Sequence, residues 1–247
     1  MKCKALVIVG TRPEAIKMAP VILALRNCPN ISCCVLATAQ HRHMLDQVMK
    51  VFDIKPDIDL DIMRPNQTLT ALTARLLIGL DDVLVSETPD VVLAQGVTTT
   101  VMTAALACFY RRIPFGHVEA GLRTWDMQNP FPEEMNRVIG GRLAKWHFAP
   151  TESSRQNLLR EGVSDTDIVV TGNTVIDALL SVVNRDVELP VELDPTKRLI
   201  LVTAHRRENF GEPFERICHA LLALLNRNQD VQVLYPVHPN PNVRDTA

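Results

Sequence analysis

The sequence predicts an α/β fold built around a parallel, doubly wound β-sheet. Short apolar runs of strand length alternate along the chain with longer stretches that read as helices. Hydrophobic residues make up 47% of the 247 residues, which is enough for a substantial core. Strands and helices that alternate at this spacing are typical of βαβ units, so we expect Rossmann-like architecture.

The first predicted domain covers residues 1–185. We expect its strands at 4–9, 33–38, 90–94, 115–119, 146–149 and 168–171, and a strand or an extended connector at 57–63. Its helices are expected at 15–26, 43–52, 68–86, 101–110, from Pro132 onward, and between a cap at Thr151 and a stop at Gly162.

Residues 186–197 have the character of a linker, and residues 198–247 begin a second Rossmann-like domain. This part predicts a strand at 199–203, a helix at 211–226 and a strand at 231–235. Two strands and one helix do not close a sheet core, and independent domains usually need about 100 residues or more. We therefore expect the second domain to be incomplete.

Charge and composition exclude no class of function sharply, but they favour some over others. The net charge of −2 and the lack of Lys/Arg-rich runs argue against nucleic-acid binding. The chain starts directly in a strand pattern and has no apolar run near the length of a membrane span, so we expect a soluble, cytoplasmic protein without membrane contact.

Cysteine and histidine spacing points to no metal site. Cys3, Cys34 and Cys108 sit in apolar runs, and no CxxC pattern is present, which favours buried thiols in a reducing compartment. His41 and His43 are close together, but two ligands rarely make a metal site. We expect neither a metal nor a cofactor.

The densest group of chemically capable residues lies between residues 91 and 137. Glu119 stands at the carboxyl end of a predicted strand, where open α/β sheets bind their ligands. Glu133 and Glu134 follow Pro132 in the first turn of a helix. They either complement the helix dipole or, with Glu119, form a carboxylate pair suited to acid/base work.

Two further strand ends carry basic residues. Arg12 and Lys17 flank a helix start and suit an anion such as phosphate, although, taken alone, this feature is better explained as a capped helix with solvated charges. His205 and Arg206 hold the corresponding position in the second unit, where His205 is a functional residue or an ordinary core or loop histidine. His238 is a weaker candidate of the same kind.

Seven sequence blocks resemble the non-hydrolysing bacterial UDP-N-acetylglucosamine 2-epimerases, and the resemblance covers essentially the whole chain. The blocks are GTRPEAIKMAP at 10–20, TAQHR at 38–42, MLDQ at 44–47, HVEAGLRT at 117–124, PEEMNR at 132–137, TGNTVID at 171–177 and AHRREN at 204–209. Each block alone is weak, but seven in the same order are specific.

The resemblance implies a two-domain fold of the glycosyltransferase-B type. It implies an enzyme that interconverts UDP-GlcNAc and UDP-ManNAc for surface polysaccharides and needs neither a metal nor a nicotinamide. It also implies a homodimer, if the second domain is complete. By resemblance, the catalytic residues are Glu119, Glu133 and His205. Residues Arg12, Lys17, Arg123 and Arg206 match substrate-binding positions. A regulatory UDP-GlcNAc site is matched by Gln40, His41, Glu134 and His238.

The chain departs from the family pattern at Val97, where the family has a catalytic Asp, and in the later part of the second domain. Valine holds no proton, and loss of a general acid/base typically costs about 100- to 10,000-fold in rate. We therefore expect a weak or inactive epimerase. The alternatives are a glycosyltransferase of similar architecture and a non-catalytic homologue that pairs with an intact subunit.

Overall fold

A computed structural model describes residues 2–38, 42–64, 67–185, 189, 191–204, 210–237 and 241–244; the side chains of residues 42–44, 241 and 242 lie outside that description. The chain divides into two compact units, Met1–Arg185 and Asp186–Ala247. The exact limits of the expected linker at 186–197 stay a prediction, since part of it lies outside the described residues.

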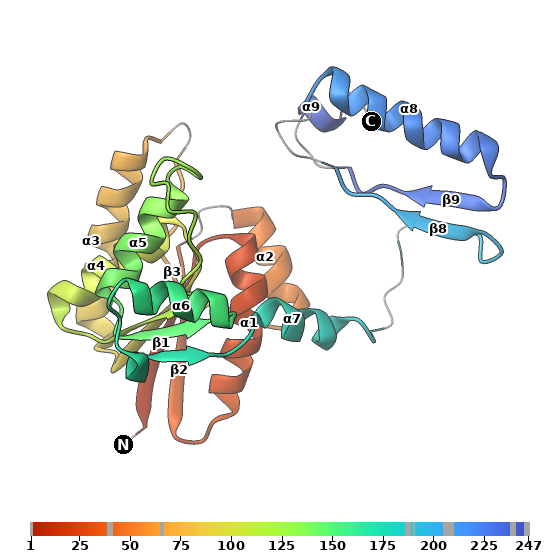
Figure 1. Cartoon of the computed structure of the whole chain (residues 1–247). Helices are drawn as coiled ribbons and strands as arrows, with labels where there is room; N and C mark the ends of the chain where they lie inside the picture. Colours follow the sequence, from red (N-terminus) through yellow and green to blue (C-terminus); the bar gives the residue numbers. More distant parts are fainter. Residues whose placement is uncertain are drawn as a thin grey trace. The chain divides into compact units, whose positions relative to one another are not determined.

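A seven-stranded parallel sheet forms the centre of the first unit (Figure 1). The strand order is β3-β2-β1-β4-β5-β6-β7, so the direction of winding reverses between β1 and β4. The strands are β1 (Cys3–Val9), β2 (Ile31–Ala37), β3 (Ile58–Asp59), β4 (Val91–Gln95), β5 (Phe115–Val118), β6 (Trp146–Ala149) and β7 (Ile168–Val170). The doubly wound α/β fold is therefore confirmed, and the 57–63 segment includes a short strand.

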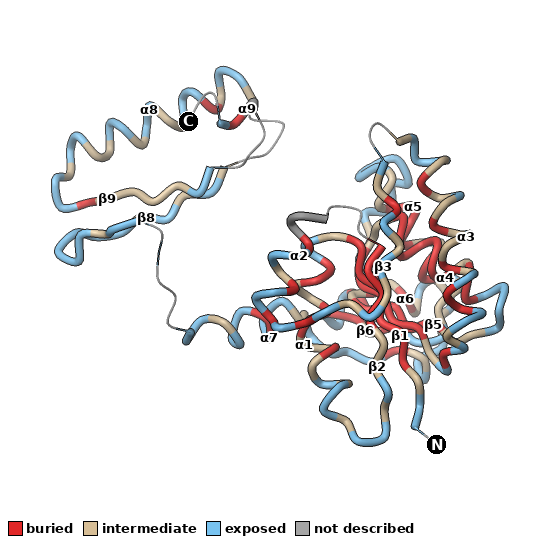
Figure 2. The backbone as a smooth tube through the Cα atoms, turned by 180° about the vertical axis from the view of Figure 1, so that it is seen from behind, coloured by how far each residue is buried: buried red, intermediate tan, exposed pale blue. Residues whose placement is uncertain are grey.

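Helices cover both faces of this sheet. The helices are α1 (Arg12–Asn27), α2 (Arg42–Val51), α3 (Leu69–Glu87), α4 (Thr99–Arg111), α5 (Glu133–Leu143), α6 (Glu152–Arg160) and α7 (Thr174–Val182). Alternate residues of β1 point to opposite faces: Leu6 and Ile8 pack with α3 and α4, whereas Val7 and Val9 pack with α1, α2 and α7. Figure 2 shows the buried residues concentrated along these strands.

Threonine caps start three of these helices. The hydroxyls of Thr68, Thr98 and Thr151 accept hydrogen bonds from backbone N–H groups three residues further on. Two expectations need correction. The first helix begins at Arg12 instead of residue 15, and Pro132 is the N-cap of α5 instead of its first helical residue.

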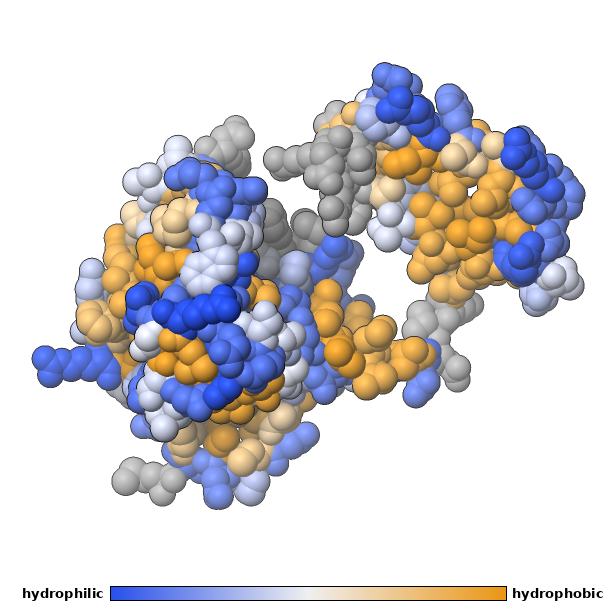
Figure 3. Space-filling model, viewed as in Figure 1, coloured by the Kyte–Doolittle hydropathy of each residue, from blue (hydrophilic) through white to orange (hydrophobic). Residues whose placement is uncertain are grey.

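Helix α7 was not predicted, although Asn173 provides a clear N-cap by accepting a hydrogen bond of 3.1 Å from the backbone N–H of Val175. The helix is apolar nearly all round, so its sequence lacks the two-sided pattern that marks a surface helix. Of its residues only Ala178 is buried, and Figure 3 shows apolar side chains exposed over this helix.

The cysteines in described positions are all free thiols. Cys108 is buried in α4, and burial raises the pKa of its thiol to about 12. The expectation of burial is wrong for Cys3, which is exposed because it is the first residue of β1, ahead of the buried part of the strand.

The second unit is a single βαβ motif followed by a short helix. Its elements are β8 (Arg198–Leu201), α8 (Glu212–Arg227), β9 (Val231–Leu234) and α9 (Pro241–Arg244), with β8 and β9 parallel. Phe214 is fully buried and meets the ring of Tyr235, whose hydroxyl donates a hydrogen bond of 2.6 Å to the Ala204 carbonyl. Within the described ranges, no helix is both long and apolar enough to span a membrane.

Candidate active site

The carboxyl ends of β1, β4 and β5 lie next to one another, on both sides of the point where the winding of the sheet reverses. Gly10 follows β1, Gln95 ends β4 and Glu119 follows β5. The predicted position of Glu119 at a strand end is confirmed. Its backbone has a φ of 64°, a conformation that non-glycine residues rarely adopt outside turns and functional sites.

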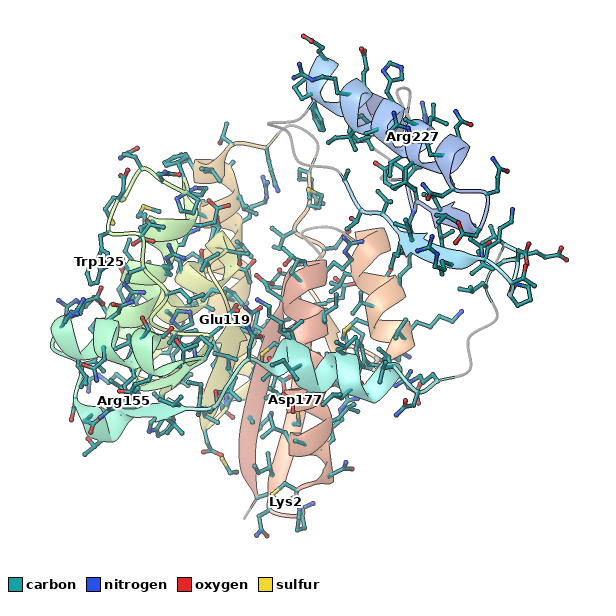
Figure 4. All side chains as sticks on the ribbon, turned by 45° about the vertical axis from the view of Figure 1, so that its right-hand side comes forward. Lys2, Glu119, Trp125, Arg155, Asp177 and Arg227 are labelled. Carbon is teal, nitrogen blue, oxygen red and sulfur yellow. The ribbon has the colours of Figure 1, made fainter. Side chains whose placement is uncertain are left out.

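The carboxylate of Glu119 is the centre of a side-chain cluster. Lys17 Nζ lies 2.7 Å from both oxygens of Glu119, and Asn173 Nδ2 donates to Oε1 at 2.9 Å. Gln95 Nε2 donates to Oε2. In the view of Figure 4, Glu119 lies near the middle of the first unit, whereas Trp125 and Arg155 lie toward its edge. Four elements that are distant in the sequence therefore meet at one carboxylate.

The start of α1 contains a second buried carboxylate, which belongs to Glu14. Its Oε2 accepts hydrogen bonds from the backbone N–H groups of Gly10 at 2.6 Å and Thr11 at 2.9 Å. Its Oε1 accepts a hydrogen bond of 2.6 Å from the hydroxyl of Thr98. Burial raises the pKa of Glu14, against the lowering effect of these hydrogen bonds.

Glu14 changes the interpretation of this helix start. We expected Arg12 and Lys17 to suit an anion at this helix start. In the structure, the backbone N–H groups of Gly10 and Thr11, which precede the helix, bind the protein's own carboxylate. The side chains expected to meet an anion at this end of α1 are those of Arg12, which is exposed, and Lys17, which is half-buried.

Gly10 is required by close packing. A Cβ at this position would lie 2.8 Å from the hydroxyl oxygens of both Thr38 and Thr100. Those two hydroxyls are 3.3 Å apart and hydrogen-bonded to each other, so neither is free to retreat. The glycine lets the β1–α1 turn approach the β4–α4 turn.

The turn that carries Val97 is held by two hydrogen bonds. Asn136 Nδ2 donates to the Val97 carbonyl at 3.0 Å, and His117 Nε2 donates to the Gly96 carbonyl at 2.7 Å. His117 is buried, which lowers the pKa of its imidazole to about 4 and keeps the ring neutral. These bonds hold the turn in place, but the valine side chain at position 97 has no titratable group and cannot act as an acid or a base.

Glu133 and Glu134 stand in different environments, although they are neighbours at the start of α5. Glu133 is half-buried. Glu134 is buried and accepts hydrogen bonds from the backbone N–H groups of Thr124 and Trp125, and it forms an ion pair with Arg137. Burial alone raises the pKa of Glu134, but the bonds from Arg137, Thr124 and Trp125 outweigh it, and the net pKa is lowered.

The structure does not bring Arg123 to Glu119. The Arg123 guanidinium forms a two-pronged ion pair with Glu161 at 2.6 and 2.8 Å, and its side chain is almost completely buried. Five other predicted site residues lie outside the described residues: Gln40, His41, His205, Arg206 and His238. Among the described residues, no three His, Cys, Asp or Glu side chains are grouped as a metal site.

Three members of the site were missed from the sequence: Glu14, Gln95 and Asn173. The pattern Thr11-Arg-Pro-Glu14 fits a capping box and could have identified Glu14. No local pattern identifies Gln95 or Asn173 as partners of Glu119, because each is far from it in the sequence.

This fold and this cluster define a doubly wound α/β protein with a polar side-chain cluster at the carboxyl ends of β1, β4 and β5, where open α/β sheets bind their ligands. Residues 23–247 match the family model described as UDP-N-acetylglucosamine 2-epimerase. The UDP-N-acetylglucosamine 2-epimerase of Escherichia coli (strain K12) is 57% identical over 98% of this chain and 67% of its own length. The chain belongs to the UDP-N-acetylglucosamine 2-epimerase family, which is a family of isomerases.

Solved structures agree with this assignment. A structure described as a putative UDP-N-acetylglucosamine 2-epimerase from Listeria monocytogenes has a TM-score of 0.90 and 50% identity, covering 100% of this chain and 65% of that one. The Neisseria meningitidis UDP-GlcNAc 2-epimerase, solved bound to UDP-GlcNAc, has a TM-score of 0.86 and 47% identity, covering 98% of this chain and 68% of that one. The present chain thus spans about two thirds of the length of its relatives.

Proposed function

We propose that the chain is a UDP-GlcNAc 2-epimerase, which interconverts UDP-GlcNAc and UDP-ManNAc, and that it carries acid/base residues of this reaction. The observation that carries this proposal is the position of Glu119. This carboxylate follows β5 and lies beside Lys17, one strand away from the point where the strand order reverses, in a chain 57% identical to a curated epimerase. The UDP-GlcNAc bound to the Neisseria meningitidis relative supports the choice of nucleotide sugar.

The proposed reaction needs a base and stabilisation of a leaving anion. A carboxylate removes the C2 proton, the C2–H electrons form a C1=C2 double bond, and the C1–O electrons leave with UDP. After C2 takes a proton on its other face, UDP adds back to C1. Glu119 and Glu133 are the proposed acid/base pair, and Arg12, Lys17 and Arg206 are proposed to stabilise the diphosphate.

Other roles come from the family resemblance. His205 is proposed to assist the departure of UDP, and Gln40, His41 and His238 to contact a regulatory UDP-GlcNAc. Glu134 is a weaker candidate for that contact, because its carboxylate already binds Thr124, Trp125 and Arg137. Arg123 is likewise paired with Glu161, so substrate binding by Arg123 would require that pair to open. We further propose a cytoplasmic homodimer that serves surface polysaccharide synthesis.

Position 97 favours a second candidate function. Valine replaces the proton-transferring Asp that the family pattern has there, and a non-catalytic chain that pairs with an intact subunit would tolerate that change. A glycosyltransferase, in contrast, would require transfer of the sugar to an acceptor.

Proton NMR in D2O separates these functions. The purified chain is incubated with UDP-GlcNAc, and the C2 proton signal and the appearance of UDP-ManNAc are followed. Exchange that disappears in the Glu119→Gln variant supports epimerisation. Absence of exchange in both the native chain and the Val97→Asp variant would count against it; exchange that appears only when a full-length homologue copurifies would favour the partner-subunit role. Transfer to an added acceptor would favour the glycosyltransferase.

A further inference from the structure

Every acceptor position of the Glu119 carboxylate is filled. An ionised carboxylate offers about four lone-pair positions, two on each oxygen. Oε1 accepts from Lys17 and Asn173, and Oε2 accepts from Lys17 and Gln95. No position is left for a proton from a substrate while all three donors stay in place. Glu119 can act as a base only after one donor leaves.

The three donors differ in their freedom to leave. Gln95 is buried and belongs to β4, where its backbone pairs with Val118 of β5. Asn173 is held from its other end, because its Oδ1 caps α7 through the N–H of Val175. Gln95 is anchored by its strand and Asn173 by its cap contact, so these two amides hold Glu119 in one orientation.

Lys17 is the mobile donor. Its ammonium ends a flexible four-carbon chain, and its side chain is 23% exposed. Within the described residues its ammonium donates only to Glu119. It is also a cation, so a second anion that approaches this strand end competes directly with Glu119 for it.

We propose that Lys17 is a switch between Glu119 and the diphosphate of the bound nucleotide. When the diphosphate arrives, the Lys17 ammonium transfers from the carboxylate to a diphosphate oxygen. One lone pair on each oxygen of Glu119 becomes free, while Gln95 and Asn173 keep the carboxylate in position. The base is thereby uncovered only when a substrate is present. This inference rests on the proposed function, since it takes Glu119 as the base and a nucleotide diphosphate as the ligand.

A double-mutant cycle on UDP binding tests the switch. The dissociation constant of UDP is measured by NMR titration for the native chain, Lys17→Met, Glu119→Gln and the double variant. Glu119→Gln removes the charge that holds Lys17, so UDP should bind about fivefold more tightly. In the Lys17→Met background the same change should alter the dissociation constant much less, because no ammonium remains to be released.

A matched control is available at the opposite end of β1. Lys4 forms a comparable ion pair with Glu87 at 2.8 Å, and Lys4→Met should leave UDP binding unchanged. A second readout is the ¹⁵N signal of the Lys17 ammonium, which should shift when UDP is added to the native chain. This signal tests the switch even if one variant folds poorly.

The outcomes separate the inference from the function on which it rests. Equal effects of Glu119→Gln in both backgrounds, or weaker UDP binding in Glu119→Gln, would overturn the switch. If C2 exchange and UDP binding are observed but the cycle shows no coupling, only the switch is lost. If neither UDP nor UDP-GlcNAc binds, the proposed function fails, and the switch fails with it.

Discussion

The carboxylate of Glu14 accepts a hydrogen bond of 2.6 Å from the hydroxyl of Thr98, which lies on a different βα turn. The same carboxylate binds the backbone of Gly10 and Thr11, so it joins the turn after β1 to the turn after β4. These turns border the point where the sheet reverses, and the second turn carries Val97. A buried acidic residue thus connects two turns at the same edge of the sheet as the proposed base.

Replacing Glu14 should distinguish its hydrogen bonds from its charge. Glu14→Ala leaves the buried N–H group of Gly10 and the half-buried N–H group of Thr11 without this partner, and a buried unsatisfied group costs about 1–3 kcal/mol. Glu14→Gln can keep these bonds through its amide oxygen, and the Thr98 hydroxyl can turn to accept from the amide nitrogen. Urea denaturation should therefore show a larger loss of unfolding free energy for Glu14→Ala.

The pH dependence of the same variants provides a second check. Because the folded-state pKa of Glu14 is raised, its contribution to stability is present below the unfolded pKa and is lost as pH rises through the folded value. Glu14→Gln should remove that decline. An identical pH profile in the native and Glu14→Gln chains would contradict this account of the buried carboxylate.

Restoring a carboxylate at position 97 should restore catalysis. Val97→Asp is expected to raise the rate of C2 proton exchange in UDP-GlcNAc by about 100- to 10,000-fold, the usual contribution of a general acid/base. Val97→Asn is the matched control, because it has nearly the same shape as the Asp variant but transfers no proton. Equal rates in both variants would mean that position 97 plays no part in proton transfer.

His117 should make the first unit sensitive to acid. Its pKa is lowered to about 4 by burial, whereas in an unfolded chain it is near 6.5. The unfolded chain therefore binds more protons between these values, and stability falls as pH decreases through this window. The His117 contribution to the unfolding free energy should fall by about 2 kcal/mol between pH 7.5 and pH 5.

Tryptophan fluorescence during urea denaturation can measure this effect, since Trp125 and Trp146 both belong to the first unit. His117→Gln should show a smaller fall in stability over the same pH interval, because its side chain does not titrate. An unchanged pH dependence in that variant would assign the acid sensitivity to other groups, such as His147 on the neighbouring strand.

Glu134→Gln should loosen the segment before α5. The change removes the negative charge that pairs with Arg137. The amide oxygen of the glutamine can still accept from the N–H groups of Thr124 and Trp125, but hydrogen bonds to a neutral oxygen are weaker than those to a carboxylate. Loss of one partner from a buried ion pair typically costs about 3 kcal/mol or more. Amide hydrogen exchange at Thr124 and Trp125 should therefore become faster, together with a lower unfolding free energy.

The exposed pair of Glu152 and Arg155 provides a control for Glu134. It has the same spacing of three residues along a helix, but Glu152 is exposed to solvent. Glu152→Gln should produce no measurable loss of stability, since water screens the pair. Equal losses in the two variants would show that burial does not decide the strength of the Glu134 pair.

Much of the first unit was predictable because its signals are local. Apolar runs marked the strands, and the position of Glu119 followed from the end of one such run. The missed helix α7 is the exception: it is short and apolar, so its sequence pattern does not distinguish a helix from a buried strand.

The sequence alone determined most of the order of strands and helices, the family resemblance and the presence of a valine at position 97, since all of these are properties of consecutive residues. Only the tertiary structure decided which side chains surround Glu119 and that Glu14 occupies the start of α1. The physical reason is that strand order in the sheet, and not distance along the chain, brings Lys17, Gln95 and Asn173 within hydrogen-bonding distance of one carboxylate.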